Sequence, residues 1–121
     1  MNPLIATITS SDPAVRDRSV WDLTSEHSTA ELLVLCEELE GFRRESKNLY
    51  ERVRASMFLH ALYRYRIQES ADLASTGLIP FGGFEDLLAR RFEQAISSFR
   101  AAAGRNGLNS ALASALAQAY E

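Results

Sequence analysis

The segment Met57-Phe-Leu-His-Ala-Leu-Tyr63 lies in the middle of a long predicted helix that runs from Ser46 to about Ser70. At about 100° per residue, apolar side chains fall on both sides of this helix. One face carries Leu49, Tyr50, Val53, Met57, His60, Ala61 and Ile67, and the opposite side carries Phe58, Leu62 and Tyr65. Because a helix that is apolar on every side is buried between neighbours, we expect this one to be the central helix of the domain.

Two helices are predicted before the central one. Ser11-Asp12-Pro13 offers a cap residue followed by proline at the first helical position, and this helix is expected to run to about Leu23. Ser28 and Glu31 fit a capping box that opens the second helix, which Gly41 is expected to end. The apolar stripe of the second helix consists of Leu32, Leu35, Cys36, Leu39 and Phe42, and its polar side carries Glu31, Glu37, Glu38 and Glu40.

Two more helices are predicted after the central one. Residues 76–83, which contain three glycines and a proline, interrupt the helical pattern. One helix then runs from Phe84 to about Ala103, and a turn at residues 104–107 leads to a last helix that begins at Asn109. The stripe of the first of these helices is Phe84, Leu88, Phe92, Ala95, Ile96, Phe99 and Ala102, and that of the last is Leu112, Ala115, Leu116, Ala119 and Tyr120. We predict one all-α domain of five or six helices over residues 1–121, either a short helical-repeat array or an irregular bundle.

The composition is that of an average globular protein, with 46% hydrophobic and 24% charged residues. No apolar run approaches the ~20 residues that span a bilayer, and no basic residue precedes an apolar stretch at the start, as it would in a secretory signal. One cysteine, Cys36, and two histidines cannot complete a zinc site, and Cys36 lies on an apolar helix face as a core residue does. We therefore expect a cytoplasmic protein without a metal, a cofactor or a membrane partner.

Positive charge is concentrated in residues 41–68, which carry seven basic and two acidic residues, whereas residues 1–40 carry eight acidic and two basic ones. The candidate binding residues in this block are Arg43, Arg44, Lys47, Arg54 and Arg66. On the central helix the last three fall within an arc of about 120°, but Glu51 and Glu69 share that arc. Interleaved acids and a pI of about 5.4 argue against a nucleic-acid partner and favour an acidic protein surface.

A second candidate site consists of His60, Arg64, Gly82 and Gly83. His60 and Arg64 lie one turn apart on an apolar face, where an unpaired charge is costly. Their partner is either a ligand carboxylate or phosphate in an internal pocket, or an acid from residues 1–40. Gly82 and Gly83 precede a predicted helix and offer either backbone amides to an anion or a tight connection onto the core. The structural interpretation is favoured for His60 and Arg64 because buried ion pairs are commonly structural. It is favoured for the glycines because they lack the Lys-Ser/Thr of a P-loop.

Aromatic and small side chains alternate in the last two predicted helices, at Phe92, Ala95, Phe99 and Ala102 and again at Leu116, Ala117 and Tyr120. With this spacing, residues 91–120 resemble the second helix of one tetratricopeptide repeat and the first helix of the next, although Gly107 stands where that family usually has proline. Residues 10–19 look similar to the start of a HEAT-type repeat. Helical repeats of these families usually bind other proteins, and the resemblance implies that role here.

Two further stretches, Asn48-Leu-Tyr-Glu-Arg-Val-Arg54 and Gly77-Leu-Ile-Pro-Phe-Gly-Gly-Phe-Glu85, look like the N-terminal region of large bacterial proteins. Some of those proteins are described as sugar-nucleotide uridylyltransferases. The resemblance implies an accessory module ahead of catalytic domains, since residues 1–121 contain no nucleotidyltransferase motif. The helical pattern also stops at Tyr120 without a terminating signal, which is typical of an N-terminal module cut from a longer chain.

These observations predict a non-catalytic helical interaction or scaffolding module. Its partner would be another protein or another domain of the same chain. One alternative is a ligand-binding or regulatory domain of a larger sugar-nucleotide enzyme, which would use His60, Arg64 and the glycine-rich segment. Another is a homodimer that shares the apolar stripe of residues 84–102 between two copies.

Overall fold

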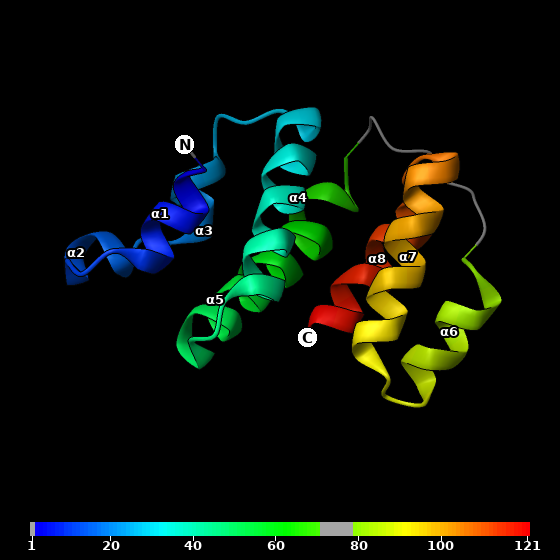
Figure 1. The fold of residues 1–121 in the computed structure, drawn as a ribbon. Helices are drawn as coiled ribbons and strands as arrows, with labels where there is room; N and C mark the ends of the chain where they lie inside the picture. Colours follow the sequence, from blue (N-terminus) through cyan, green and yellow to red (C-terminus); the bar gives the residue numbers. More distant parts are fainter. Residues whose placement is uncertain (1, 71–78) are drawn as a thin grey trace.

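The computed structural model describes residues 2–70 and 79–121, and its regular secondary structure is helical (Figure 1). The α-helices in these two ranges are α1 (Pro3–Thr9), α2 (Pro13–Arg16), α3 (Val20–Thr24), α4 (Thr29–Glu45), α5 (Leu49–Ala61), α6 (Phe81–Leu88), α7 (Phe92–Asn106) and α8 (Ser110–Tyr120). A π-helical segment, η1 (Leu62–Ile67), continues α5. The all-α prediction is confirmed, but the described residues form more helices than the five or six predicted. Residues 76–78, where the predicted interruption begins, lie outside the described residues.

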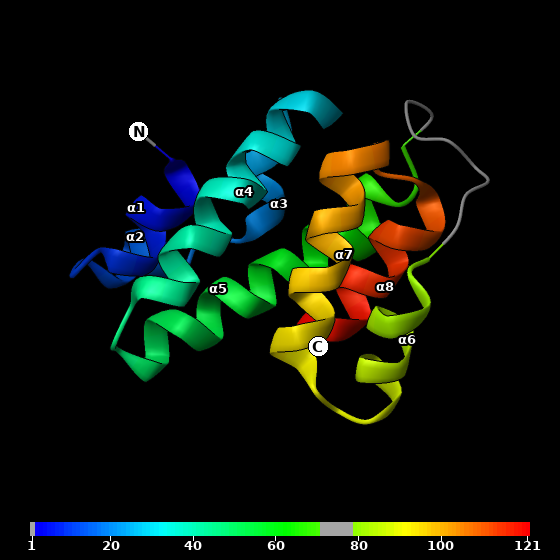
Figure 2. The same ribbon diagram turned by 45° about the vertical axis from the view of Figure 1, so that its right-hand side comes forward.

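The long helix α5 has the central position that its all-round apolar sequence predicts. It packs against α1, α4 and α8, and η1 extends its contacts to α4 and α8. The short helices α1, α2 and α3 lie on one side of the α4–α5 pair, while α6, α7 and α8 lie on the other (Figures 1 and 2). One connected core of buried apolar side chains joins the two sides.

Local capping starts most of these helices. Ser28 accepts a hydrogen bond from the Glu31 amide, and the Glu31 carboxylate accepts one from the Ser28 amide, so the predicted capping box is confirmed. Asn109 caps α8 through the amide of Leu112, which confirms the predicted start of the last helix. Helix α1 was not predicted. It also begins with a side-chain cap, since the Asn2 side chain accepts hydrogen bonds from the amides of Leu4 and Ile5.

Three predicted boundaries in the first half are wrong. The central helix, expected to open at Ser46, begins at Leu49 after its Asn48 cap. The single helix expected between Ser11 and Leu23 is two helices, because Ser19 caps a new start at α3. Gly41 does not end α4, which continues for another turn to Glu45. The last turn of α4 carries Arg43, whose side chain is buried and bonded to other helices, and these tertiary contacts outweigh the low helix propensity of an exposed glycine.

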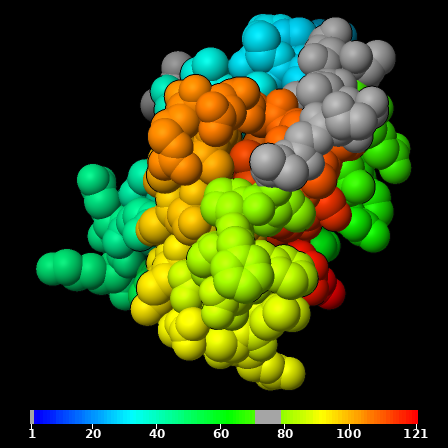
Figure 3. Space-filling view, turned by 90° about the vertical axis from the view of Figure 1, so that its right-hand side faces the viewer, coloured from blue at the N-terminus to red at the C-terminus, as the bar shows by residue number. Residues whose placement is uncertain are grey.

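The helix predicted from Phe84 to Ala103 is also two helices. The chain turns at Arg90, which has a φ of 63° in the left-handed region, and α6 folds back onto α7. The turn changes which apolar residues are buried. Leu87, Ala95, Ile96 and Phe99 lie in the core, whereas Phe84, Leu88 and Phe92 remain largely exposed. Figure 3 shows α6 on the outside of the molecule, over α7.

Contrary to the expectation from the sequence, the central helix is not buried on every side. The buried residues of α5 and η1 are Ala55, Phe58, Leu59, Leu62, Tyr63 and Ile67. Leu49, Val53 and Met57 from the predicted stripe are 74%, 49% and 59% exposed. Helices α1, α4 and α8 cover the opposite side of the first half of α5, so this apolar row is left outside.

Two adjacent glycines in α6 give a matched test of how closely α6 approaches α7. A Cβ on Gly83 would lie 2.7 Å from Ser98 Oγ and 2.8 Å from Phe99 Cε1, whereas one on Gly82 would meet no described residue within 4 Å. We predict that Gly83→Ala lowers the free energy of unfolding by about 1–3 kcal/mol. Gly82→Ala should leave it unchanged or raise it slightly. Urea denaturation of both variants measures this, and equal stabilities would contradict the close approach.

Candidate functional site

A buried carboxylate joins three helices next to the open face of α5. Glu40 of α4 is only 1% exposed, although the sequence pattern placed it on the polar side of that helix. Its Oε1 accepts hydrogen bonds from Arg43 Nε at 2.9 Å and from the Tyr120 hydroxyl at 2.6 Å. Arg44 Nε donates to the other oxygen, Oε2. A carboxylate away from water is tolerated because these donors replace its hydration.

Arg43 extends the contact to α7. Its Nη1 and Nη2 donate to the two oxygens of Glu93 at 2.6 and 3.2 Å, which is a bidentate pair. The guanidinium also lies 5.3 Å from the centre of the Tyr120 ring, and Tyr63 stacks on the same ring with 6.1 Å between centroids. We call Glu40, Arg43, Arg44, Glu93 and Tyr120 the Glu40 cluster.

The charges of this cluster support one another. Burial by itself would raise the pKa of Glu40, but the hydrogen bonds from Arg43, Tyr120 and Arg44 outweigh it and hold that pKa below its ordinary value. The hydrogen bonds from Arg43 likewise lower the pKa of Glu93. Burial and the neighbouring Glu40 charge raise the pKa of the Tyr120 hydroxyl, so it remains a donor. The cluster is therefore a fixed, ionised structural unit.

An apolar groove of about 430 Å³ opens beside the Glu40 cluster, and we call it the α5–α7 groove. Leu49, Val53 and Met57 of α5 line one side. Phe92 and Ile96 at the start of α7 line the other side, and Phe92 is 43% exposed. The remaining lining residues are Arg43, Arg52, Ser56, Glu93, Ala119, Tyr120 and Glu121. The cluster thus supplies part of the groove's surface through Arg43, Glu93 and Tyr120.

The spacing of the groove's apolar residues matches the surface rows of a helix. Leu49, Val53 and Met57 are four residues apart, and so are Phe92 and Ile96. Residues four apart form a ridge along a helix surface, and another helix packs with its own ridges in the space between two such rows. With a rise of about 1.5 Å per residue, the α5 row is about 12 Å long, or roughly two turns of a bound helix. The groove can therefore accept a short apolar helix face.

Most of the predicted basic residues are engaged within the chain. Arg43 and Arg44 belong to the Glu40 cluster. Arg54 donates to the Arg16 carbonyl at 3.0 Å, at the end of α2, and Arg66 donates to the Thr24 carbonyl at 3.1 Å, at the end of α3. Cations at the ends of helices satisfy their last carbonyls, so these two side chains hold the N-terminal helices in place. Lys47 is exposed just before α5.

The residues of the second candidate site are only partly brought together. His60 and Arg64 line one polar pocket, but Gly82 and Gly83 lie in α6, and Gly83 is buried against Ser98 and Phe99. Arg64 is exposed, and no acid of residues 2–40 pairs with it.

Three further observations concern the described residues. Cys36 is buried, which raises its pKa as expected for a core thiol. No group of three side chains suited to a metal ion occurs in residues 2–70 and 79–121. In the same residues, no helix is both long enough and apolar enough to cross a membrane.

Sequence reasoning missed Glu40 and the exposed row on α5. A signal for Glu40 did exist, since Cys36, Glu40 and Arg43 follow one another at i, i+4 and i+7 on the row that buries Leu32 and Leu39. No comparable signal separates the two apolar faces of α5, because either of them satisfies the helical period.

We predict that Glu40→Gln lowers the free energy of unfolding by about 3–5 kcal/mol, because it leaves the buried Arg43 guanidinium without one of its two carboxylate partners. The matched control is Glu45→Gln, which removes the same charge from an exposed position on the same helix. It should change stability by no more than about 0.5 kcal/mol. Urea denaturation at neutral pH compares the two variants, and a loss that is the same in both would show that the cluster contributes nothing specific.

The lowered pKa values of Glu40 and Glu93 predict acid sensitivity. A carboxyl whose pKa is lower in the folded chain stabilises it fully above the ordinary value of 4.5, and this stabilisation is lost as the pH falls through the folded-state value. Stability should therefore decline below pH 4.5. The decline should be smaller in Glu40→Gln, which has one of these groups removed. Urea midpoints across the acid range measure both curves, and parallel curves would disprove the assignment to Glu40.

Comparison with known proteins adds no assignment to this site. The chain matches no protein-family model, no curated protein and no solved structure. Helices α7 and α8 pack side by side across the turn at Gly107, where φ is 81°, and the likeness of residues 91–120 to a tetratricopeptide repeat stays a prediction. What the site can do is inferred from its own residues and geometry.

Proposed function

We propose that this chain is a non-catalytic protein-interaction module and that the α5–α7 groove is its docking surface. The observation that carries the proposal is the exposed row Leu49, Val53 and Met57, which faces Phe92 across the groove. We place the module in the cytoplasm, where a free thiol such as that of Cys36 stays reduced.

The exposure of these side chains is unfavourable in the chain alone. Apolar surface contributes about 25 cal/mol per Å² when it leaves water, and large exposed apolar patches mark interaction surfaces. Four large apolar side chains line the two sides of the groove, namely Leu49, Val53, Met57 and Phe92. Together they form a continuous concave apolar surface, which scattered surface residues do not form. A partner that covers the groove would recover this hydrophobic free energy.

The occupant we propose is an amphipathic helix from a partner protein or from another domain. It would place apolar residues at about four-residue spacing into the groove, in the helix-in-groove mode of recognition. Arg52 lines the same groove and forms no ion pair with a carboxylate among the described residues. An acidic residue on the flank of the bound helix would meet that charge and fix the orientation of the helix.

The Glu40 cluster supports this role because it makes the groove rigid. Arg43, Glu93 and Tyr120 are held by hydrogen bonds and ring contacts before any partner arrives. A preformed surface loses less conformational entropy on binding than a flexible one, so more of the contact energy remains as affinity.

Photo-crosslinking tests the groove in cells that express the chain. A photoreactive residue at position 57 should give a defined crosslink to one partner segment, and the same residue at position 34 should not. Val34 is the matched control because it is 60% exposed on α4 and does not line the groove. A synthetic peptide of the crosslinked segment should then bind the purified chain.

The change Val53→Glu should weaken that peptide at least about tenfold, because it puts a charge into the apolar wall. Val34→Glu should leave binding unchanged, and both variants should keep the wild-type unfolding midpoint, since both sites are exposed. Equal crosslinking at positions 57 and 34, or equal peptide binding by both variants, would refute the docking surface. A crosslink between two copies of this chain would show that the groove binds a second copy, in a homodimer, and not a helix of another protein.

A further inference from the structure

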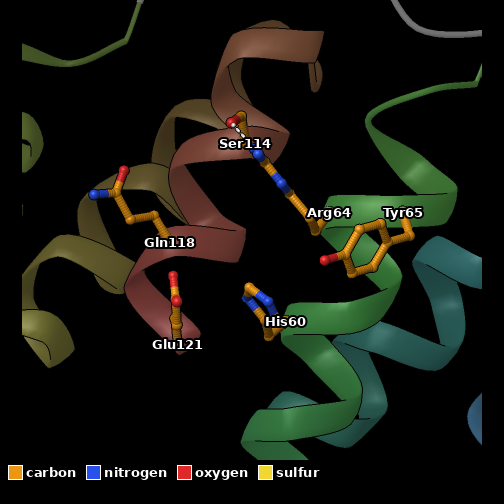
Figure 4. Close-up of a pocket in the computed structure, with 6 residues that line it drawn as sticks. All are labelled: His60, Arg64, Tyr65, Ser114, Gln118 and Glu121. Atoms are coloured by element: carbon orange, nitrogen blue, oxygen red, sulfur yellow. Dashed lines mark hydrogen bonds between the residues drawn. The ribbon is translucent and has the colours of Figure 1, made fainter.

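A polar pocket of about 290 Å³ lies between the end of α5, the π-helical segment η1 and α8. Its lining is mainly polar, whereas that of the α5–α7 groove is mainly apolar, and Glu121 lines both. Its lining residues are His60, Arg64, Tyr65, Ser114, Gln118 and Glu121. Figure 4 shows Arg64 reaching toward Ser114, with Gln118 and Glu121 on the α8 side of the pocket.

His60 presents one free ring nitrogen. Its Nδ1 lies 2.7 Å from the Ala117 carbonyl oxygen, which can only accept a hydrogen bond, so Nδ1 is the donor and carries a proton. No hydrogen-bond partner for Nε2 occurs among the described residues. Nε2 is an acceptor when the ring is neutral and a donor when it is protonated. The contact with α8 thus fixes the ring and leaves the second nitrogen available to a ligand.

Arg64 differs from the arginines that stabilise the fold. Arg43, Arg44, Arg91 and Arg100 all form ion pairs with carboxylates. Arg64 has no such pair among the described residues, and its Nη1 contacts only the Ser114 hydroxyl, at 3.2 Å. Most of the guanidinium's donors therefore remain unused, in a planar arrangement that matches the oxygens of a carboxylate or a phosphate.

The π-helical segment helps to build this pocket. Arg64 and Tyr65 both lie in η1, where Gln68 donates to the Tyr63 carbonyl five residues back, at 3.0 Å. π-Helical turns are rare and frequently occur at functional sites, and this one forms the C-terminal end of the central helix. Tyr65 packs edge-on between Trp21 and His60, with ring centroids 5.9 and 6.3 Å away. These ring contacts hold Tyr65 beside His60 at the pocket.

We propose that this pocket binds a small oxyanion, either a carboxylate or a phosphate group of a free metabolite. Arg64 would hold two of its oxygens, and the hydroxyls of Ser114 and Tyr65 would donate to it. The Glu121 carboxylate opposes negative charge at its end of the pocket, so the anionic group sits toward Arg64. This site is independent of the partner helix proposed for the groove.

The test titrates the chain with inorganic phosphate, and separately with acetate, at constant pH and ionic strength. Two-dimensional NMR spectra should show saturable shifts of the Arg64 and Ser114 amide signals. Phosphate alone shifting them would identify a phosphate group, and acetate alone a carboxylate. If neither anion gives a saturable shift, the proposal is wrong.

Charge-matched variants separate this pocket from general electrostatic attraction. Arg64→Gln should weaken binding at least about tenfold, since it removes the bidentate donor. Arg105→Gln removes the same charge from an exposed position on α7 and should leave binding unchanged. Glu121→Gln should tighten binding, because it removes the opposing charge. Equal weakening by the two arginine variants would show that the anion binds to no defined pocket. This outcome does not depend on whether a partner helix binds the α5–α7 groove.

Discussion

The burial of one carboxylate, that of Glu40, is the constraint on which the arrangement of the second half of the molecule depends. An ionised group away from water is tolerated only when donors surround it, and these donors come from α4 itself and from Tyr120 of α8. Arg43 then carries the contact to Glu93 of α7. Because hydrogen bonds are directional, they set the position of α7 and α8 against α4 in a way that apolar contacts alone do not.

Both surface hollows follow from that arrangement. Tyr120 and Arg43 take part in the lining of the groove, and the same end of α8 brings Gln118 and Glu121 to the polar pocket. The groove is apolar because no helix of the described residues covers the α5 row that lines it. The pocket is polar because η1 and α8 meet there through Arg64 and Ser114. One rigid polar cluster thus positions two surfaces of opposite character.

The basic residues show how little a charge count says about a binding surface. Of the five predicted as an interface, Arg43 and Arg44 satisfy a buried carboxylate, while Arg54 and Arg66 cap the short helices α2 and α3. The contacts of Arg54 and Arg66 join residues far apart in the chain, and Arg43 is buried in the fold. A charge count along the sequence shows neither the long-range contacts nor the burial. Arg64 and Arg52 have no carboxylate partner among the described residues, and each lines one of the two surfaces for which we propose a ligand or partner.

The sequence by itself determined that the chain is helical and where several helices begin. The Ser28 capping box and the Asn109 cap depend on residues three positions apart, and such local interactions can be recognised before any packing is known. Tertiary structure alone decided which face of α5 is buried, that Glu40 lies inside and that the chain reverses at Arg90. An amphipathic period is satisfied by either apolar face of α5. The neighbouring helices decide which face of α5 is buried, because they cover only one of them. The hydrogen-bond donors around Glu40 decide that this charge can lie inside the fold.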